Sequence, residues 1–310
     1  MRNTFVNTLL LLARENTNIV LITGDLGFGV LTEFAKELPG QFINAGIAEQ
    51  NMTGVAVGLA LCGKIVFTYS IANFPTLRCL EQVRNDAAYH HANVKIVSVG
   101  AGMAYGPSGM SHHATEDIAV MRALPDVAVF SPGDPIEAEA VTRAVVKHPG
   151  TCYLRLGKGK EKNVHAAPLQ WETGKAVPLI EDGEDAALFS TGPILGNVYE
   201  AALSLNRLGK RTRHYSFPSV KPLDKALIRE IARETPLIVT VEEHNLTGGF
   251  GGAVAEVLAE MPSPRAKLRR IGINDHYVSS IGSQAFLREE NHLSCDDIIN
   301  AVREETDPTV

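Results

Sequence analysis

Two groups of residues in the first half of the chain have types and spacing that suit chemistry. Glu49 stands shortly before a small, apolar run at residues 53–60, and His112 and His113 lie together in a glycine-rich segment. A carboxyl group held against apolar surroundings is a candidate for proton transfer, whereas a glutamate in the first turn of a helix is also typical of simple dipole stabilisation. A glycine-rich loop is poor material for a core, so at least one histidine is predicted to act as an acid, a base or a hydrogen-bond donor. No third ligand accompanies the histidines at metal spacing, and no metal site is predicted.

Three further residues could contact a ligand. Asp25 follows an apolar, strand-like run and could accept a hydrogen bond from a ligand or simply cap a helix. Phe74 precedes Pro75, a residue typical of the first turn of a helix, so its ring could stack on a flat ligand or pack back on that helix. Arg78 falls within the first turn of the same predicted helix.

These residues need a scaffold that brings separate loops to one place. Near-continuous apolar strands separated by helices indicate a parallel sheet that is covered on both faces. Ligands of such open sheets bind beyond the carboxyl ends of the strands, where the loops named above fall. The predicted strands are 19–23, 41–44, 64–68, 94–99, 127–131 and 151–154, and the main predicted helices are 48–61, 75–91 and 135–147.

The predicted fold class is therefore α/β with two domains. A doubly wound, mostly parallel sheet occupies residues 1–157, a linker rich in Lys, Gly and Pro occupies 158–185, and a smaller α/β domain occupies 186–310. The second domain is predicted to contain strands at 186–190, 212–216, 237–242 and 268–271 and helices near 195–208, 223–234 and 252–261.

Composition limits the class of protein. The chain has 310 residues, of which 45% are hydrophobic and 21% charged, as expected of globular domains. Its 29 Lys and Arg against 35 Asp and Glu give a net charge of −6 that is spread along the chain, which argues against a nucleic-acid or anionic membrane surface. Neither a membrane-spanning run nor the cleavage signature of an export signal is found, so we expect a cytoplasmic protein.

Four motifs then occur in a specific order: GIAEQ at 46–50, SHHATEDIA at 111–119, KPLD at 221–224 and EEHNLTGGFGG at 242–252. Together they resemble the C-terminal half of transketolase and its thiamine-diphosphate relatives, which include deoxyxylulose-phosphate synthase and the β subunits of 2-oxo-acid dehydrogenases. The resemblance implies a pyrimidine-binding domain followed by a transketolase C-terminal domain.

The resemblance also implies roles for the cofactor-side residues. Glu49 matches the glutamate that contacts the aminopyrimidine ring of thiamine diphosphate. A carboxyl group bonded to the ring nitrogen favours the imino tautomer, whose nitrogen then removes the thiazolium proton. Phe74 matches the aromatic residue that stacks on the pyrimidine, and Asp25 lies where the family has a cofactor-side aspartate.

On the substrate side, His112 matches the motif histidine that approaches the reacting oxygens, and His113 replaces the glutamine beside it. Arg155 matches a substrate-phosphate arginine, and Arg78 is a candidate for a second, because a guanidinium fork binds phosphate oxygens in pairs. Ser108 stands where transketolase proper has an aspartate.

In the segment around Gly100, a glycine stands where the family has a histidine of the phosphate site. These departures put ordinary pentose-phosphate specificity in doubt and suggest a modified sugar, or one whose phosphate is carried elsewhere.

The Gly-Asp-Gly motif and downstream Asn that bind Mg²⁺ and the diphosphate in this family do not occur here. The resemblance therefore implies a partner, an N-terminal transketolase-like subunit that supplies them, with the cofactor shared across an α2β2 assembly and small sugars as substrates. Ketol transfer is the leading interpretation. The alternatives are a β subunit of a 2-oxo-acid dehydrogenase, a deoxyxylulose-phosphate-synthase-like enzyme and a noncatalytic regulatory subunit.

Overall fold

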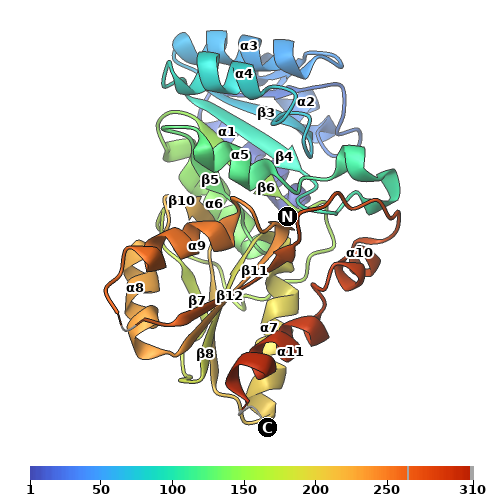
Figure 1. Cartoon of the computed structure of the whole chain (residues 1–310). Helices are drawn as coiled ribbons and strands as arrows, with labels where there is room; N and C mark the ends of the chain where they lie inside the picture. Colours follow the sequence, from blue (N-terminus) through green and yellow to red (C-terminus); the bar gives the residue numbers. More distant parts are fainter. Residues whose placement is uncertain (264, 308–310) are drawn as a thin grey trace.

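Two open sheets organise the computed structural model, which describes residues 1–263 and 265–307 (Figure 1). The first is a seven-stranded sheet in the order β10-β5-β6-β4-β3-β1-β2, with neighbouring strands parallel except for the antiparallel pair β10 and β5. Its strands are β1 (Ile19–Thr23), β2 (Phe42–Asn44), β3 (Ile65–Ile71), β4 (Val94–Val99), β5 (Ala128–Phe130), β6 (Cys152–Leu156) and β10 (Ser219–Lys221).

Helices cover both faces of this sheet. They are α1 (Arg2–Glu15), α2 (Thr32–Glu37), α3 (Glu49–Leu61), α4 (Leu80–Gln82), α5 (Asp117–Ala123) and α6 (Pro135–Lys147), with 3-10 turns at Pro39–Gln41, Gly106–Ser108 and Met110–His112 and a π turn at Val83–Ala88. Helices α1 and α6 share one apolar cluster with the strands, and α3 and α5 belong to a second cluster. The central strands β1, β4 and β6 are buried along their whole length, so their continuous apolar runs are explained by cover on both faces.

The second sheet has five strands in the order β12-β11-β8-β9-β7 and lies below the first in Figure 1. Its strands are β7 (Val177–Ile180), β8 (Ala186–Thr191), β9 (Thr212–Ser216), β11 (Leu237–Asn245) and β12 (Lys267–Ile273). The accompanying helices are α7 (Leu195–Arg207), α8 (Lys225–Glu234), α9 (Phe250–Ala259), α10 (Gln284–Glu290) and α11 (Cys295–Thr306), with a 3-10 turn at Gly192–Ile194. Two mostly parallel α/β sheets confirm the predicted fold class.

Two segments differ from the sequence-based expectation. The stretch 158–185, predicted to be a linker without regular structure, contains β7, which pairs antiparallel with β9 at the edge of the second sheet. The helix predicted at 75–91 begins only at Leu80 and continues as a π turn. The backbone before it is held in turns because the carbonyl of Asn73 accepts hydrogen bonds from the N–H groups of Thr76 and Leu77.

The two sheets share a core. Strand β10 follows β9 of the second sheet along the chain but pairs with β5 of the first. One apolar cluster runs without interruption from Val20 in β1 to Ala266 before β12, and the rings of Phe217 and Phe250 lie 5.1 Å apart within it. The relative position of the sheets is therefore set by packed side chains as well as by the connecting chain.

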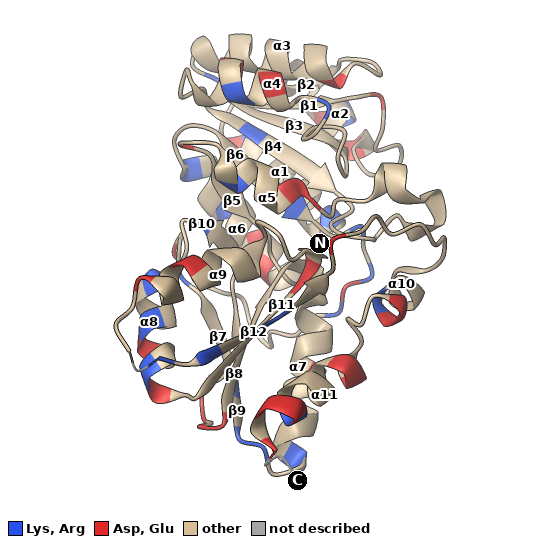
Figure 2. Ribbon diagram, viewed as in Figure 1, with Lys and Arg blue, Asp and Glu red and all other residues tan. Residues whose placement is uncertain are grey.

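Charge is unevenly distributed over the elements. Figure 2 shows Lys, Arg, Asp and Glu gathered on α8 and α11, whereas α3 is almost free of charge after its first residue. Val55 and Leu61 of α3 are exposed, at 37% and 62%. In residues 1–263 and 265–307 no helix is long and apolar enough to cross a membrane.

Candidate active site at the carboxyl ends of β1, β3 and β4

Glu49 is the first residue of α3 and is buried, with an exposed fraction of 2%. Its Oε1 accepts a hydrogen bond from the hydroxyl of Ser70 in β3 over 3.2 Å, and its Oε2 accepts one from Nη1 of Arg78 over 2.7 Å. Gly46, at φ +74°, gives the chain the left-handed conformation it needs between β2 and α3. The carboxyl group is thus carried inward to the end of the sheet rather than out into solvent.

Gly24, directly after β1, lies next to this carboxyl group. A Cβ at position 24 would lie 3.4 Å from Cγ and 3.5 Å from Cδ of Glu49. A larger side chain would therefore press on the carboxyl group. The absence of a side chain here lets the Glu49 side chain lie close to the backbone at the end of β1.

Phe74 and His112 lie next to each other. Their ring centroids are 5.2 Å apart and the ring planes meet at 66°, an edge-to-face contact. The amide of Asn73 ties their two loops together, since its Nδ2 donates to the carbonyls of Ser111 at 3.1 Å and His113 at 3.2 Å. The loop after β3 and the histidine loop after β4 therefore form one connected surface.

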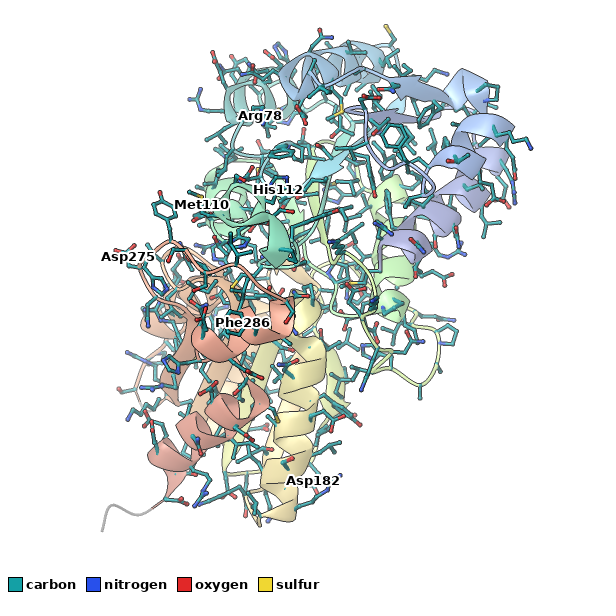
Figure 3. The ribbon with its side chains drawn as sticks, turned by 90° about the vertical axis from the view of Figure 1, so that its right-hand side faces the viewer. Arg78, Met110, His112, Asp182, Asp275 and Phe286 are labelled. Carbon is teal, nitrogen blue, oxygen red and sulfur yellow. The ribbon has the colours of Figure 1, made fainter. Side chains whose placement is uncertain are left out.

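Arg78 lies against both parts of this site. Besides its bond to Glu49, its guanidinium carbon stands 4.5 Å from the centroid of the Phe74 ring. Figure 3 places Arg78 on the same side of the molecule as His112 and Met110. One nitrogen of the Arg78 guanidinium group is bonded to the buried carboxylate of Glu49, and a role of Arg78 as a second phosphate arginine stays a prediction.

Asp25 has a backbone φ of +56° and is paired with Asn44. The amide of Asn44 donates to Oδ1 of Asp25 over 2.9 Å, and its carbonyl oxygen accepts from the N–H of Asp25 over 3.1 Å. These bonds hold the turn between β1 and α2 and account for an aspartate at this position. A contact from Asp25 to a cofactor stays a prediction.

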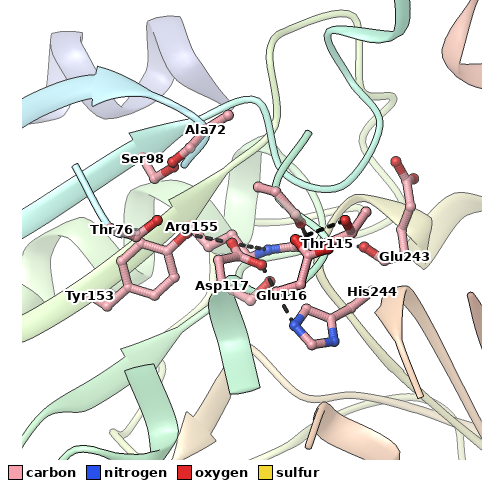
Figure 4. A network of polar contacts seen from close by, with 12 residues as sticks. Ala72, Thr76, Ser98, Thr115, Glu116, Asp117, Tyr153, Arg155, Glu243 and His244 are labelled. Atoms are coloured by element: carbon pink, nitrogen blue, oxygen red, sulfur yellow. Dashed lines mark hydrogen bonds and ion pairs between the residues drawn. The ribbon is translucent and has the colours of Figure 1, made fainter. Parts of the chain in front are cut away.

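Arg155 lies inside the protein. The family resemblance implied a substrate-phosphate arginine, but its side chain is 1% exposed, and within the described residues its Nε and Nη2 have protein partners whereas its Nη1 has none. Its Nε donates to Oδ2 of Asp117 over 2.7 Å, and its Nη2 donates to the carbonyls of Ala114 and Glu243 (Figure 4). Burial of an arginine at the end of a central strand cannot be read from the residue type, and this placement does not support direct contact of Arg155 with a substrate phosphate.

His113 is likewise less accessible than predicted. It is 2% exposed, and within the described part of the chain neither ring nitrogen has a hydrogen-bond partner. Burial lowers the pKa of His113, while nearby Glu243 opposes that shift. We therefore expect the buried His113 ring to be neutral. Its placement does not support direct contact of His113 with a substrate.

Several residues of the site were missed by sequence reasoning. Ser70 bonds Glu49, and Tyr105 lies with its ring centroid 6.2 Å from that of His112. Lys158, which is exposed, has its Nζ 4.2 Å from the centroid of the Tyr105 ring. Ser70 could have been found from its place at the end of β3, but Lys158 lies in the predicted linker, where no sequence signal marked it.

The space near Gly100 is filled from within the same loop. Gly100 has φ +104°, and a Cβ there would lie only 2.2 Å from Cδ2 of Tyr105. Tyr105 therefore occupies the volume into which a histidine at position 100 would project. The glycine at this place follows from the presence of the tyrosine.

The motif at 242–252 has structural roles. Both carboxylate oxygens of Glu242 accept N–H groups at the start of α9, from Phe250 at 2.6 Å and Gly251 at 2.7 Å, and burial raises the pKa of Glu242 to about 7. Glu243 accepts the N–H of Met103 over 2.6 Å and Nε of Arg288 over 2.6 Å. These buried carboxylates fix α9, α10 and the loop after β4 against β11.

His244 completes this network beside Asp117 (Figure 4). Its Nδ1 bonds the carbonyl of Asn245 over 2.7 Å, and its Nε2 accepts the N–H of Ala119 over 3.3 Å. One ring nitrogen must donate and the other accept, so the neutral tautomer fits. Burial accordingly lowers the pKa of His244 to about 4.

Among residues 1–263 and 265–307, no group of three or more His, Cys, Asp or Glu could hold a metal ion.

The structure thus brings Glu49, Phe74, Arg78 and His112 to one end of the first sheet. A buried carboxyl group and an aromatic ring at this edge, followed by a second α/β sheet, define a class of proteins with a pyrimidine-binding domain and a C-terminal α/β domain. The model of the transketolase pyrimidine binding domain matches residues 1–162, and that of the transketolase C-terminal domain matches residues 174–298. The chain belongs to the transketolase family.

Relatives of similar length support this assignment. One of the subunits of the apulose-4-phosphate transketolase of Phocaeicola vulgatus is 41% identical over 279 residues, which cover 89% of this chain and 88% of that protein. A putative transketolase C-terminal section of Methanocaldococcus jannaschii is 38% identical over 308 residues, covering 98% and 96%. A solved structure described as a split gene transketolase, inactive beta4 tetramer, is 37% identical with a TM-score of 0.88 and covers 98% of this chain and 96% of its own.

Proposed function

We propose that this chain is the C-terminal, β-like subunit of a split, thiamine-diphosphate-dependent transketolase. It would transfer a two-carbon ketol unit from a ketose to an aldose acceptor, together with an N-terminal subunit that carries the diphosphate and Mg²⁺ site. Residues 1–157 would form the pyrimidine-binding domain and residues 186–310 the C-terminal domain, joined by 158–185. The names and lengths of the relatives support this proposal, because two of them are also subunits or sections of a transketolase.

The observation that carries the proposal is that one flat group, the Arg78 guanidinium, reaches both the buried carboxyl group of Glu49 and the face of Phe74. The carboxyl group and the aromatic ring fit a flat aminopyrimidine with N–H and ring-nitrogen groups at its edge. When bound, the cofactor supplies an acidic thiazolium carbon that can attack a carbonyl group. Glu49 would hold a proton at the ring nitrogen and Phe74 would fix the plane of the ring.

The substrate would be bound by the histidine loop and its neighbours. His112 lies at the edge of Phe74 and would donate hydrogen bonds to the reacting oxygens. With Arg155 buried, Lys158 is an exposed cation near this loop and would bind an anionic end of the sugar. Ser108 and the glycine near Gly100 differ from the residues of an ordinary transketolase site, and this supports a modified sugar as one of the substrates.

The test is turnover by the assembled enzyme. The chain is combined with the subunit of a neighbouring gene that carries Gly-Asp-Gly, with thiamine diphosphate and Mg²⁺, and ketose consumption is measured with an aldehyde acceptor. We expect aldehyde product without release of CO₂. Release of CO₂ from a 2-oxo acid would assign the chain to a dehydrogenase β subunit instead, and full turnover by Glu49→Ala would assign it a regulatory role.

A further inference from the structure

Arg78 makes two contacts that the proposed function assigns to the aminopyrimidine ring. Its Nη1 donates to Oε2 of Glu49 over 2.7 Å, and its Cζ stands 4.5 Å from the centroid of the Phe74 ring. A flat donor that reaches the carboxyl group while covering the aromatic face must lie between those two anchors. The guanidinium group therefore lies in the position that the two anchors define.

A guanidinium group and an aminopyrimidine ring share the properties that this position selects. Both are planar, both carry N–H groups at the edge and both stack on aromatic faces. The guanidinium group also gives the 2%-exposed carboxyl group of Glu49 a charged partner. A carboxylate buried without a partner is costly, so the free subunit needs such an occupant.

We propose that Arg78 occupies the aminopyrimidine position of the free subunit and leaves it when the cofactor binds. The inference rests on the proposed function, because it takes Glu49 and Phe74 as the anchors of the cofactor. The side chain of Arg78 is 46% exposed, so its guanidinium group can move into solvent without unpacking the core. Arg78 also lies within the turns at residues 73–79, before α4 begins at Leu80, rather than inside a long helix.

If the Arg78 side chain must be displaced, the apparent affinity of the chain for the aminopyrimidine ring is lowered. A ligand that binds only the state with Arg78 moved out has an apparent Kd equal to its intrinsic Kd divided by the populated fraction of that state. Removal of the guanidinium group should therefore tighten binding of the ring. A residue that merely stabilised the loop would have the opposite effect, because its loss would loosen the site.

The experiment compares the full-length wild-type chain with Arg78→Ala, using free 4-amino-5-hydroxymethyl-2-methylpyrimidine as the probe. Affinity is measured by ligand-observed NMR saturation transfer. We expect the variant to bind the probe at least about tenfold more tightly than the wild type. Low millimolar guanidinium chloride should displace the probe from the variant, with sodium chloride at the same ionic strength as the control.

Arg84→Ala is the matched control. Arg84 is also exposed, lies six positions further along and donates to Asn85, so its loss should leave the affinity unchanged. Arg78→Lys is the second variant, because it keeps a cation for Glu49 while giving up the planar group over Phe74. If Arg78→Ala does not fold, a several-fold tighter Kd of Arg78→Lys relative to the wild type supports the proposal.

Two results would overturn the proposal. One is probe affinity in the folded variant that is equal to or weaker than that of the wild type, including no binding at all. The other is a gain that survives when Phe74→Ala is added, since the ring would then not be the second anchor. A failure of the proposed function gives a different result. In that case the assembled wild-type enzyme does not consume ketose, while Arg78→Ala still binds the probe more tightly than the wild type.

Discussion

Arg155 at the end of β6 and Asp117 at the start of α5 form an ion pair of 2.7 Å that is closed to solvent, with 1% of each side chain exposed. The same guanidinium group reaches the carbonyl of Glu243 in β11 of the second sheet. The pair therefore joins a strand and a helix of the first sheet to the central region of the second (Figure 4).

Asp117→Asn should lower the free energy of unfolding by about 3–5 kcal/mol, because it leaves a buried guanidinium charge without its partner. Urea denaturation at fixed protein concentration measures the change. The control is Glu139→Gln, which removes an exposed pair with Arg143 on α6 and should cost less than about 1 kcal/mol. Equal losses for the two variants would show that the buried pair does not hold the sheets together.

Glu49→Gln should lower kcat of the assembled enzyme by about 100-fold or more, because a carboxamide cannot carry a proton to and from the ring nitrogen. Steady-state ketose consumption gives the value, and circular dichroism confirms the fold. Glu81→Gln, at an exposed position of α4, should keep wild-type turnover. Near-wild-type turnover in Glu49→Gln would remove this residue from the mechanism.

Phe74→Ala should raise the Kd of the assembled enzyme for thiamine diphosphate about 10- to 100-fold, since stacking on an aromatic side chain is worth about 1–3 kcal/mol. Titration of the cofactor against turnover measures it. Phe74→Tyr retains the ring and should restore the affinity. An unchanged Kd in the alanine variant would mean that the cofactor stacks elsewhere.

Lys158→Met should raise the KM for a phosphorylated or sulfonated sugar about tenfold while leaving the KM for a neutral sugar unchanged. The difference between the two substrates isolates the charge from general damage to the site. Lys160→Met, another exposed lysine in the same segment, is the control. A similar rise for both sugars would argue against an anion site at Lys158.

Glu242 should give the stability of the chain a pH dependence. Burial raises its pKa to about 7, so between the ordinary value of 4.5 and about 7 the folded chain keeps a proton that the unfolded chain has lost. This contribution to stability is complete below pH 4.5, falls as the pH rises through 7 and amounts to about 3 kcal/mol.

Urea unfolding at several pH values between 4.5 and 8 tests this assignment. The free energy of unfolding of wild type relative to Glu242→Gln should fall across that range. His244, whose pKa is lowered to about 4, contributes the opposite slope below pH 6.5, and because its Nδ1 lies 3.7 Å from Oε2 of Glu242, only its coupling to Glu242 enters the difference. A constant difference between the two proteins would contradict the assignment.

Local patterns were enough to predict the architecture and the position of Glu49. The apolar runs of β1, β4 and β6 have a single physical explanation, burial on both faces, and the glycines and charges around them mark the loops. The site residues on those loops follow from the rule that ligands bind at the carboxyl ends of parallel strands.

Pairing partners and burial could not be predicted in the same way. The sequence does not show that Arg78 meets Glu49 or that Arg155 meets Asp117, because each pair joins residues 29 and 38 positions apart through the tertiary fold. The sequence alone does not distinguish an arginine that binds a ligand from an arginine that is buried in the core. Strands β7 and β10 were missed because they are only four and three residues long, too short for a strand pattern to be recognised.

Strand β10 has a consequence for how this chain can be recombined. Exchange of the C-terminal portion with that of another gene would remove the strand that pairs with β5 and expose β5 as an open edge, a template for association with other chains. The fusion partner would have to bring a strand of matching register. Engineered chimeras should therefore place their junction after Lys221 rather than between the sheets, so that the first sheet keeps its own edge strand whatever segment is joined to it.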